Sequence, residues 1–218
     1  MVATFPTALA DLADLLGIRS VSWLPYRQQE LSGLGSGEWL TADLAPMLWE
    51  GKCETSPVTI AAANQLQARF ELLDGSANAF YLFNPLAKYP QTDPSGATLG
   101  SSTVTITAIS TNRDTVTLAG LPAGYVLTIG DMFSVDYGSP SRRGLYRFAA
   151  TATASGLGAL GPIEVRPRIR SGVTTALAIT LKKPAAKVKI VPESFSVQQV
   201  GINHAVIGFI ARQTLQAG

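Results

Sequence analysis

The chain has 218 residues, of which 46% are hydrophobic and only 15% are charged, with 20 Gly and 13 Pro. This length can bury one large or two small cores, and the composition excludes a disordered chain. Apolar runs are shorter than the roughly 18 residues of a membrane span, and Asp11 and Asp14 stand where a signal peptide is basic, so we expect neither segment. Cys53 is alone, which excludes an intrachain disulfide and indicates folding in a reducing cytoplasm.

Charge is distributed unevenly along the chain. Residues 1–138 hold six Lys or Arg against 13 Asp or Glu, a net −7, whereas residues 139–192 hold ten Lys or Arg against Glu164 alone, a net +9. Such asymmetry fits nucleic-acid binding, and it equally fits a basic face of one copy meeting an acidic face of another. The sequence alone leaves both interpretations open.

The first elements alternate between short apolar patterns and turns. Leucines at helical spacing predict an amphipathic helix over residues 7–16, and residues 18–24 are typical of a strand. Residues 27–40 form a Gly/Ser-rich stretch that we interpret as a mobile loop; its GLGSG lacks the Lys-Ser/Thr of a phosphate-binding loop. Residues 38–44 and 48–55 are two further strand candidates, separated by a proline.

One longer helix is expected after residue 55. Ser56-Pro57 has the composition of a helix cap followed by proline at the first helical position, and Asp74-Gly75 ends the pattern. The aromatic run AFYLFNP that follows predicts a strand. We place Trp49 and the helix residues Leu66 and Phe70 in the core. The apolar stripe of the helix consists of Ile60, Ala63, Leu66, Phe70 and Leu73.

The composition and the residue pattern of the sequence change after Tyr89. YPQTDPSGATLGSS is rich in turn residues, and short runs of β-branched residues follow at intervals of roughly ten residues. These runs are STVTITAI, TVTLAG, MFSVDYG, LYRFAATAT, PIEVRP, ALAITL and KVKIVP, with AVIGFIA near the end. The pattern predicts a mainly β protein: an α+β unit up to about residue 86, then a small sandwich or barrel over about 100–184. Residues 185–218 fit either unit.

Residues that carry chemistry elsewhere are isolated in this chain. The only histidine, His204, lies in a strand-like run without a nucleophile motif, and Cys53 has no second thiol. Asp93 and Asp131 sit in turn sequences, and together with Asp136 they do not form a calcium loop. We therefore predict a protein that is not an enzyme, with no catalytic, cofactor-binding or metal-binding residues.

Arginines are the most distinctive polar feature of the basic half. In an extended segment Arg166, Arg168 and Arg170 share one face because successive side chains alternate. Aromatic residues do not interleave with them, and no nucleic-acid-binding motif accompanies them, so a protein contact is the favoured interpretation. The residues that we assign to this protein interface are Arg142, Arg143, Arg166, Arg168 and Arg170.

Several phrases, in this order, resemble a known family. They are VSWL, APMLWEGK, ELLDGSANAFYLFNP, YPQTDPSGATLG, GLPAGYVLTIGDMFSVDYG, RRGLYRF, IEVRPRIRSG and LKKPAAKVKIVPESF. Together they resemble the distal tail proteins of long-tailed, siphovirus-like bacteriophages and prophages. The resemblance is spread over most of the chain.

This resemblance implies a structural virion component at the tail tip, or baseplate, made in the cytoplasm of the host bacterium. Such proteins form a homohexameric ring that joins the tail-tube protein to the tail-tip hub protein, and viral DNA passes through the lumen without specific binding. The implied fold is a β-sandwich "belt" with one amphipathic helix, formed by residues 1–86 and 185–218. A small β-barrel, residues 87–184 with a hinge at 87–100, is inserted into it. GLGSGEWL would be a ring-spanning arm.

Two other functions remain as alternatives. In the first, the inserted barrel is a carbohydrate-binding module for attachment to the host surface, which exposed aromatics on one barrel face would favour. The three tryptophans Trp23, Trp39 and Trp49 fit sugar stacking, although Trp is more often a core residue or an interface anchor. In the second, the chain is another tail component, such as a tube or terminator protein.

Overall fold

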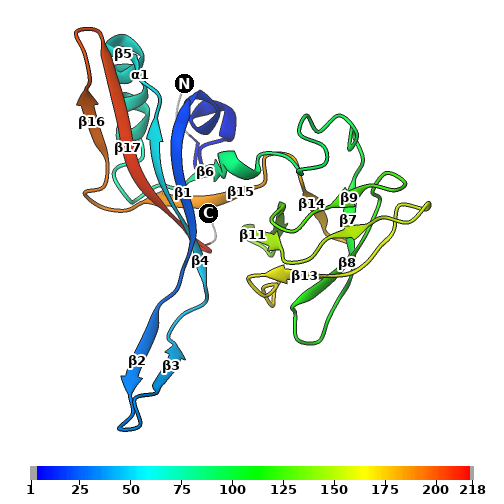
Figure 1. The fold of residues 1–218 in the computed structure, drawn as a ribbon. Helices are drawn as coiled ribbons and strands as arrows, with labels where there is room; N and C mark the ends of the chain where they lie inside the picture. Colours follow the sequence, from blue (N-terminus) through cyan, green and yellow to red (C-terminus); the bar gives the residue numbers. More distant parts are fainter. Residues whose placement is uncertain (1–3, 217–218) are drawn as a thin grey trace.

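A computed structural model describes residues 4–216 of the chain. Its strands build two main units that stand side by side in Figure 1, a twisted sheet and a closed barrel, with a hairpin projecting from the sheet. The predicted mainly β fold with one helix and a small barrel is confirmed. Among the described residues no helix has the length and apolar character needed to cross a membrane.

One continuous seven-stranded sheet forms the first unit, in place of the two stacked sheets of a sandwich. The central strand of the sheet is β17. The second half of β17 pairs with β4 and β15, and its first half pairs with β5 and β16. The main path runs β1-β4-β17-β15-β6. The strands are β1 (Ile18–Tyr26), β4 (Leu48–Thr55), β5 (Val58–Thr59), β6 (Phe80–Phe83), β15 (Ala185–Ile190), β16 (Ser196–Gln199) and β17 (His204–Gln213).

The sheet therefore combines strands from both ends of the sequence. β6 precedes the barrel in the chain and β15 follows it, and the two strands pair directly with Ala185 opposite Phe83. Where the chain enters and leaves the barrel, the Lys183 N–H donates to the Lys88 carbonyl at 2.7 Å. The barrel is thus inserted between two neighbouring strands of one sheet.

A single α-helix, α1 (Ile60–Glu71), packs on this sheet. It begins later than its predicted cap at Ser56-Pro57, because Ser56 donates its N–H to Gly17 and β5 stays extended against β17. Thr59 caps the helix instead, with its hydroxyl accepting from the Ala62 N–H. Leu66 and Phe70 lie in the core as predicted, as does Trp49.

The predicted helix over residues 7–16 is wrong. The segment forms two separate 3-10 turns, Leu9–Asp11 and Ala13–Leu15, with Leu12 in a non-helical conformation between them. Hydrogen bonds to Ala79 and Tyr81 hold Thr7 extended beside β6, so a regular helix does not begin at this residue. Leu12 nevertheless reaches the core as its spacing indicated.

The barrel closes through six strands in the order β10-β11-β13-β8-β7-β14. Its centre contains a stack of three buried rings, in which the Phe133 centroid lies 5.2 Å from that of Tyr146 and 4.8 Å from that of Phe148. A short pair, β9 with β12, lies beside it. The strands are β7 (Val104–Ile109), β8 (Thr115–Ala119), β9 (Val126–Leu127), β10 (Met132–Tyr137), β11 (Arg142–Phe148), β12 (Ala152–Thr153), β13 (Leu160–Arg166) and β14 (Ala178–Thr180).

Residues 87–100, expected as a hinge, are fastened to the barrel. The Gln91 N–H donates to the buried Asp131 carboxylate at 2.9 Å, and the Thr92 hydroxyl donates to the Val126 carbonyl at 2.6 Å. Asp93 is also buried and accepts the N–H of Leu99 at 2.8 Å. This segment is consequently part of the packing of the barrel.

Candidate assembly interface

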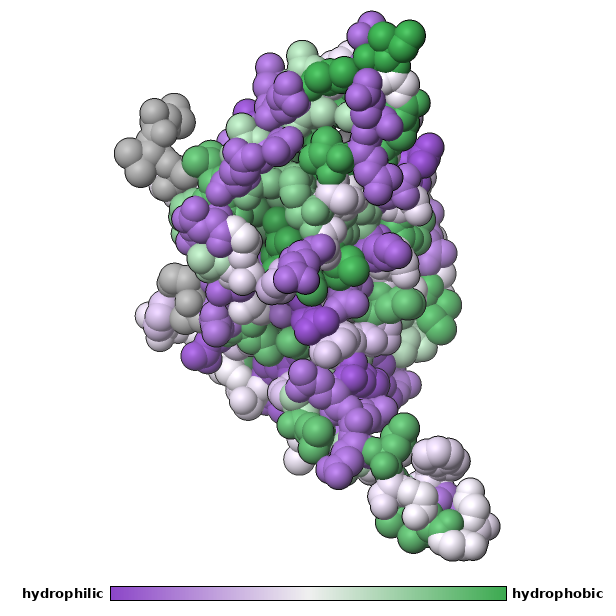
Figure 2. Space-filling view, turned by 90° about the vertical axis from the view of Figure 1, so that its left-hand side faces the viewer, coloured by the Kyte–Doolittle hydropathy of each residue, from purple (hydrophilic) through white to green (hydrophobic). Residues whose placement is uncertain are grey.

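Residues 27–40, expected as a mobile loop, and the strand predicted at 38–44 together form a two-stranded β-hairpin, so the predicted strand is confirmed and the loop is corrected. β2 (Gln29–Gly33) pairs with β3 (Trp39–Asp43) in continuous antiparallel register, and a tight turn with Gly37 at positive φ joins them. Every residue of both strands is exposed. We call residues 27–44 the arm; it extends β1 and β4 beyond the body of the sheet and stands clear of the barrel (Figures 1 and 2).

Large apolar side chains cover the arm although no part of the described chain packs on it. Trp39 is 70% exposed and Leu44 is 65% exposed. Contiguous exposed apolar residues of this kind mark interaction sites. The exposed apolar residues of the arm are Leu31, Leu34, Trp39, Leu40 and Leu44.

The register of the arm separates two faces. Cross-strand partners lie on the same face of a hairpin, so Leu31 and Trp39 lie on one side, with Gln29 donating to Asp43 at 2.7 Å. The opposite face, which we call the leucine–glutamate face, carries both glutamates of the arm, and no ion pair holds either of them within the described chain. Its residues are Glu30, Leu34, Glu38, Leu40 and Leu44.

The sheet and the barrel share a continuous core at their junction. Met132 and Leu145 of the barrel belong to the same buried cluster as the sheet residues. The buried Trp49 indole donates its Nε1–H to the Leu145 carbonyl at 2.9 Å, and the Trp49 N–H donates to Gln213 Oε1 at 3.2 Å. The first bond joins the two units and helps to fix the orientation of the barrel on the sheet, whereas the second joins two strands of the sheet.

Cations of the barrel lie over aromatic rings of the sheet at the same junction. The Arg143 guanidinium carbon is 4.1 Å from the Tyr81 ring centroid, and that of Arg147 is 4.9 Å from the Trp49 ring. Burial disfavours charge on Arg143, but its bond to Asp136 outweighs burial and raises the guanidinium pKa. Burial alone lowers the pKa of Arg147. Cation–π contacts of this type contribute about 0.5–2 kcal/mol each.

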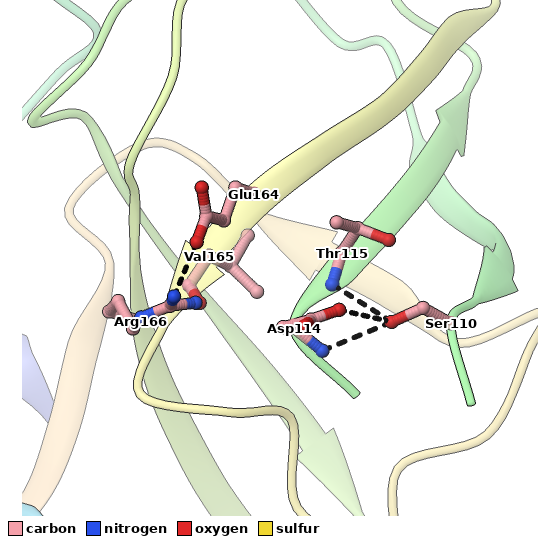
Figure 3. A network of polar contacts seen from close by, with 6 residues as sticks. All are labelled: Ser110, Asp114, Thr115, Glu164, Val165 and Arg166. Atoms are coloured by element: carbon pink, nitrogen blue, oxygen red, sulfur yellow. Dashed lines mark hydrogen bonds and ion pairs between the residues drawn. The ribbon is translucent and has the colours of Figure 1, made fainter. Parts of the chain in front are cut away.

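Two of the five predicted interface arginines are paired within the chain. Arg143 donates Nε to Asp136 Oδ1 at 2.6 Å across the β10–β11 pair. Arg166 pairs with Glu164 on the same strand, beside the β7–β8 turn where the Asp114 carboxylate accepts from the Ser110 hydroxyl (Figure 3). Both guanidiniums are therefore already partly neutralised.

The other three predicted arginines come together in a groove of about 390 Å³ beside the junction. Arg170 is half-buried and donates to the Met47 carbonyl, at the base of the arm. Arg142 and Arg168 are exposed and form no ion pair among residues 4–216. Within the described part of the chain, no acidic side chain lines this basic groove. Its other residues are Pro46, Tyr137, Ile169, Ser171, Gly172 and Leu215.

The charge asymmetry follows the two structural units. Residues 1–86 and 185–218 together hold seven Lys or Arg and ten Asp or Glu, a net −3, whereas residues 87–184 hold ten and five, a net +5. The sheet unit is therefore acidic and the barrel unit basic. Opposite net charges on two units favour contacts between different copies over contacts between like units.

The two residues considered as nucleophile and base are far apart. Cys53 pairs in register with Phe209, whereas His204 lies five positions earlier on β17, a separation of roughly 17 Å along a strand. Burial raises the pKa of the Cys53 thiol to about 12, so the thiol stays protonated at neutral pH. Groups of three or more potential metal ligands do not occur among the described residues.

Buried carboxylates of the barrel have structural partners. Burial acts to raise the pKa of Asp93, but bonds from the N–H groups of Leu99 and Thr98 and from the Tyr125 hydroxyl outweigh it and lower the pKa. Burial and the nearby Asp93 carboxylate raise the pKa of Tyr125. These groups hold the turn at residues 93–99 in place.

The aromatic residues of the barrel strands and their connections are buried. Between residues 104 and 184 the aromatic side chains are Tyr125, Phe133, Tyr137, Tyr146 and Phe148, and each is buried. Sugar binding by stacking requires an exposed ring, and residues 104–184 present none, although Tyr89 in the segment fastened to the barrel is half-buried. The exposed Trp39 lies instead on the arm.

The leucine–glutamate face of the arm was missed by the sequence interpretation. Its signal was present: the alternation from Trp39 to Leu44 and the Gly-rich turn before it are typical of a hairpin. The basic groove was found only in part, because Pro46 and Leu215 are far from its arginines in the chain. No family model matches the sequence, and comparison with curated proteins finds no match.

Proposed function

We propose that this protein is a structural component of a bacteriophage tail that forms a homohexameric ring at the distal end, between the tail tube and the tail-tip hub. The arm is the observation that carries the proposal. A two-stranded hairpin is marginally stable on its own in water, and this one exposes four leucines and a tryptophan. Burial of each such side chain contributes about 1.5–3 kcal/mol, so the arm has a strong tendency to bind another molecule.

The fixed junction also supports a ring. A head-to-tail contact closes into a ring only if the rotation from one copy to the next is constant. The Trp49–Leu145 bond and the shared core at Met132 and Leu145 hold the arm-bearing sheet at a set angle to the barrel. Every copy then presents its arm and its basic groove in the same relative geometry.

The acidic sheet unit and the basic barrel unit favour this association further. In a ring of identical copies, heterologous contacts place different surfaces against each other, so complementary charges add attraction and exclude like-charged pairings. The tube and hub proteins are the other expected partners, and the proposed place of the protein is the virion tail tip. Viral DNA would pass through the lumen. The proposed role requires no catalytic group.

Position in the particle tests this proposal against other tail components. We expect negative-stain images of the concentrated full-length protein to contain six-fold rings. On intact tails, a gold-labelled antibody against the chain should mark one band between tube and tip. Labelling along the whole tube, or at the head-proximal end, would show instead a tube or terminator protein.

A further inference from the structure

The basic groove has the composition of a docking site for an acidic and apolar segment. Arg142 and Arg168 are exposed and form no ion pair within residues 4–216, and Arg170 lines the groove while it donates to the Met47 carbonyl. Pro46 and Leu215 add apolar surface beside these charges, whereas Ile169 is buried in the core of the barrel. Because arginine carries a weakly hydrated, planar cation, it suits contacts with carboxylates that lose water.

The leucine–glutamate face of the arm has the complementary composition. Glu30 and Glu38 carry two negative charges, and residues 27–44 have a net charge of −2 because Asp43 and Arg27 cancel. Leu34, Leu40 and Leu44 supply apolar side chains on the same face. The other face, with Leu31 and Trp39, lacks an unpaired carboxylate, since Asp43 accepts from Gln29.

The arm of a chain does not lie on its own groove. Pro46 lines the groove and Met47 is bound to Arg170, so the chain leaves the groove at the base of the arm. From there the arm leads away from the barrel, and its tip is free in Figures 1 and 2. An arm that fills this groove must therefore come from another copy.

We infer that the leucine–glutamate face of the arm of one copy seats in the basic groove of the neighbouring copy. Glu30 and Glu38 face the guanidiniums of Arg142 and Arg168, and the leucines pack on the apolar residues between them. The inference rests on the proposed ring, and it names the contact that closes it. Of the five predicted arginines, it assigns Arg142, Arg168 and Arg170 to the interface and leaves Arg143 and Arg166 in pairs within one chain.

Disulfide trapping between two full-length variants tests the contact. One chain carries Leu40→Cys on the arm, and a second chain with a different tag carries Ser171→Cys in the groove. The natural Cys53 is buried and protonated, so it stays out of the exchange. After mild oxidation of a concentrated mixture, we expect disulfide-linked pairs with one copy of each tag.

The matched control replaces the groove cysteine with Leu157→Cys, at a fully exposed loop tip of the barrel. Docking holds two thiols at a high effective concentration, so the Leu40–Ser171 pair should form at least about tenfold more linked product than the control pair. Equal yields for both pairs would overturn the inference.

The same samples separate this contact from the ring itself. Specific linking with closed six-fold rings supports both. Rings without linking above the control overturn the arm–groove contact and leave the proposed ring standing. Specific linking in samples whose negative-stain images contain no six-fold rings supports the contact and overturns the hexameric ring.

Charge exchange provides a second, independent readout. Glu30→Arg with Glu38→Arg in the Leu40→Cys chain should lower linking to the unchanged groove about tenfold through like-charge repulsion. Arg142→Glu with Arg168→Glu in the groove chain should do the same with the unchanged arm. Mixing the two altered chains should restore linking. Failure of this restoration, with both variants folded by circular dichroism, would contradict the pairing.

Discussion

The arm and the barrel use the same local pattern of alternating residues in opposite ways. The barrel closes six strands on themselves, so its inward side chains, including Tyr146 and Phe148, are fully buried. The arm has two strands with free edges, and all ten of their residues are exposed. A closed sheet satisfies its own backbone and apolar surface, whereas an open hairpin leaves both for a partner. Stability and association are thus placed in different parts of the molecule.

Truncation of a core ring should show the largest contrast. Phe133 is stacked between two rings in the barrel, so Phe133→Ala should lower the free energy of unfolding by about 3–5 kcal/mol. Trp39→Ala on the arm should change it by less than about 0.5 kcal/mol in the dilute protein. Urea denaturation of both variants measures the difference. Similar losses for the two would mean that the arm packs within its own chain.

A smaller loss is expected at the junction. In Trp49→Phe the ring remains, but the buried Leu145 carbonyl loses the indole N–H that it accepts. An unpaired buried acceptor costs about 1–3 kcal/mol. Because the two units share a core, the wild-type chain should unfold in one transition. Fluorescence and circular dichroism, recorded on the same sample, should then give the same unfolding curve. If the variant is as stable as the wild type, the Trp49–Leu145 bond does not contribute to the rigidity of the junction.

Substitutions at two glycines compare the stability effect of an added methyl group in the packed sheet and in the open arm. A Cβ added at Gly51 would lie 2.6 Å from the Trp23 ring of the neighbouring strand, whereas nothing lies within 4 Å of one added at Gly33 in the arm. Gly51→Ala should therefore destabilise by about 1–3 kcal/mol through overpacking. Gly33→Ala should be neutral or slightly stabilising. Thermal denaturation of the pair checks both, and a stable Gly51→Ala chain would show that Trp23 can move.

The smallest expected effect is a dependence on pH. Because the folded-state pKa of Asp93 is lowered, its carboxylate contributes stability that is present above the unfolded value near 3.9 and is lost as pH falls through the folded pKa. Asp93→Asn should therefore flatten the acid side of the stability profile. Leu31→Ala on the exposed arm removes no titratable group and should leave that profile unchanged. The midpoints of urea denaturation, measured at several pH values from neutral to acidic, compare these variants with the wild type.

Much of the strand content was predictable because each strand carries its own pattern. The runs at 104–109, 115–119 and 132–137 alternate β-branched or aromatic residues between turn signals, and each is a strand of the barrel. The two-residue strands β5 and β9 were missed, since two residues cannot display a period. The first helix was wrongly predicted for the converse reason: its leucine spacing was helical, but contacts with β6 decided the backbone.

For the candidate interface, the sequence predicted which residue type it contains, arginine, but not which arginines are free to bind a partner. Alternation placed the arginines on one face, but Arg166 is followed by Pro167 at the end of β13, and Arg170 turns to a carbonyl 123 residues away. Which guanidiniums are free depends on Asp136 and Glu164 lying within reach. Asp136 reaches Arg143 through the register of β10 against β11, about which the arginine pattern contains no information, whereas Glu164 lies two positions before Arg166 on the same strand.

The sequence by itself determined most strands of the barrel, the one long helix, the absence of an intrachain disulfide and the separation of acidic from basic segments. These depend on residue type and short spacing, which act within a few positions of the chain. Tertiary structure alone decided that β17 pairs with β4 across some 150 residues, that Trp49 bonds to the barrel, and that the arm stands free. The pattern of residues in a strand specifies which side chains share a face. The backbone groups along the edges of the strand can bond to any other strand that the packing brings near.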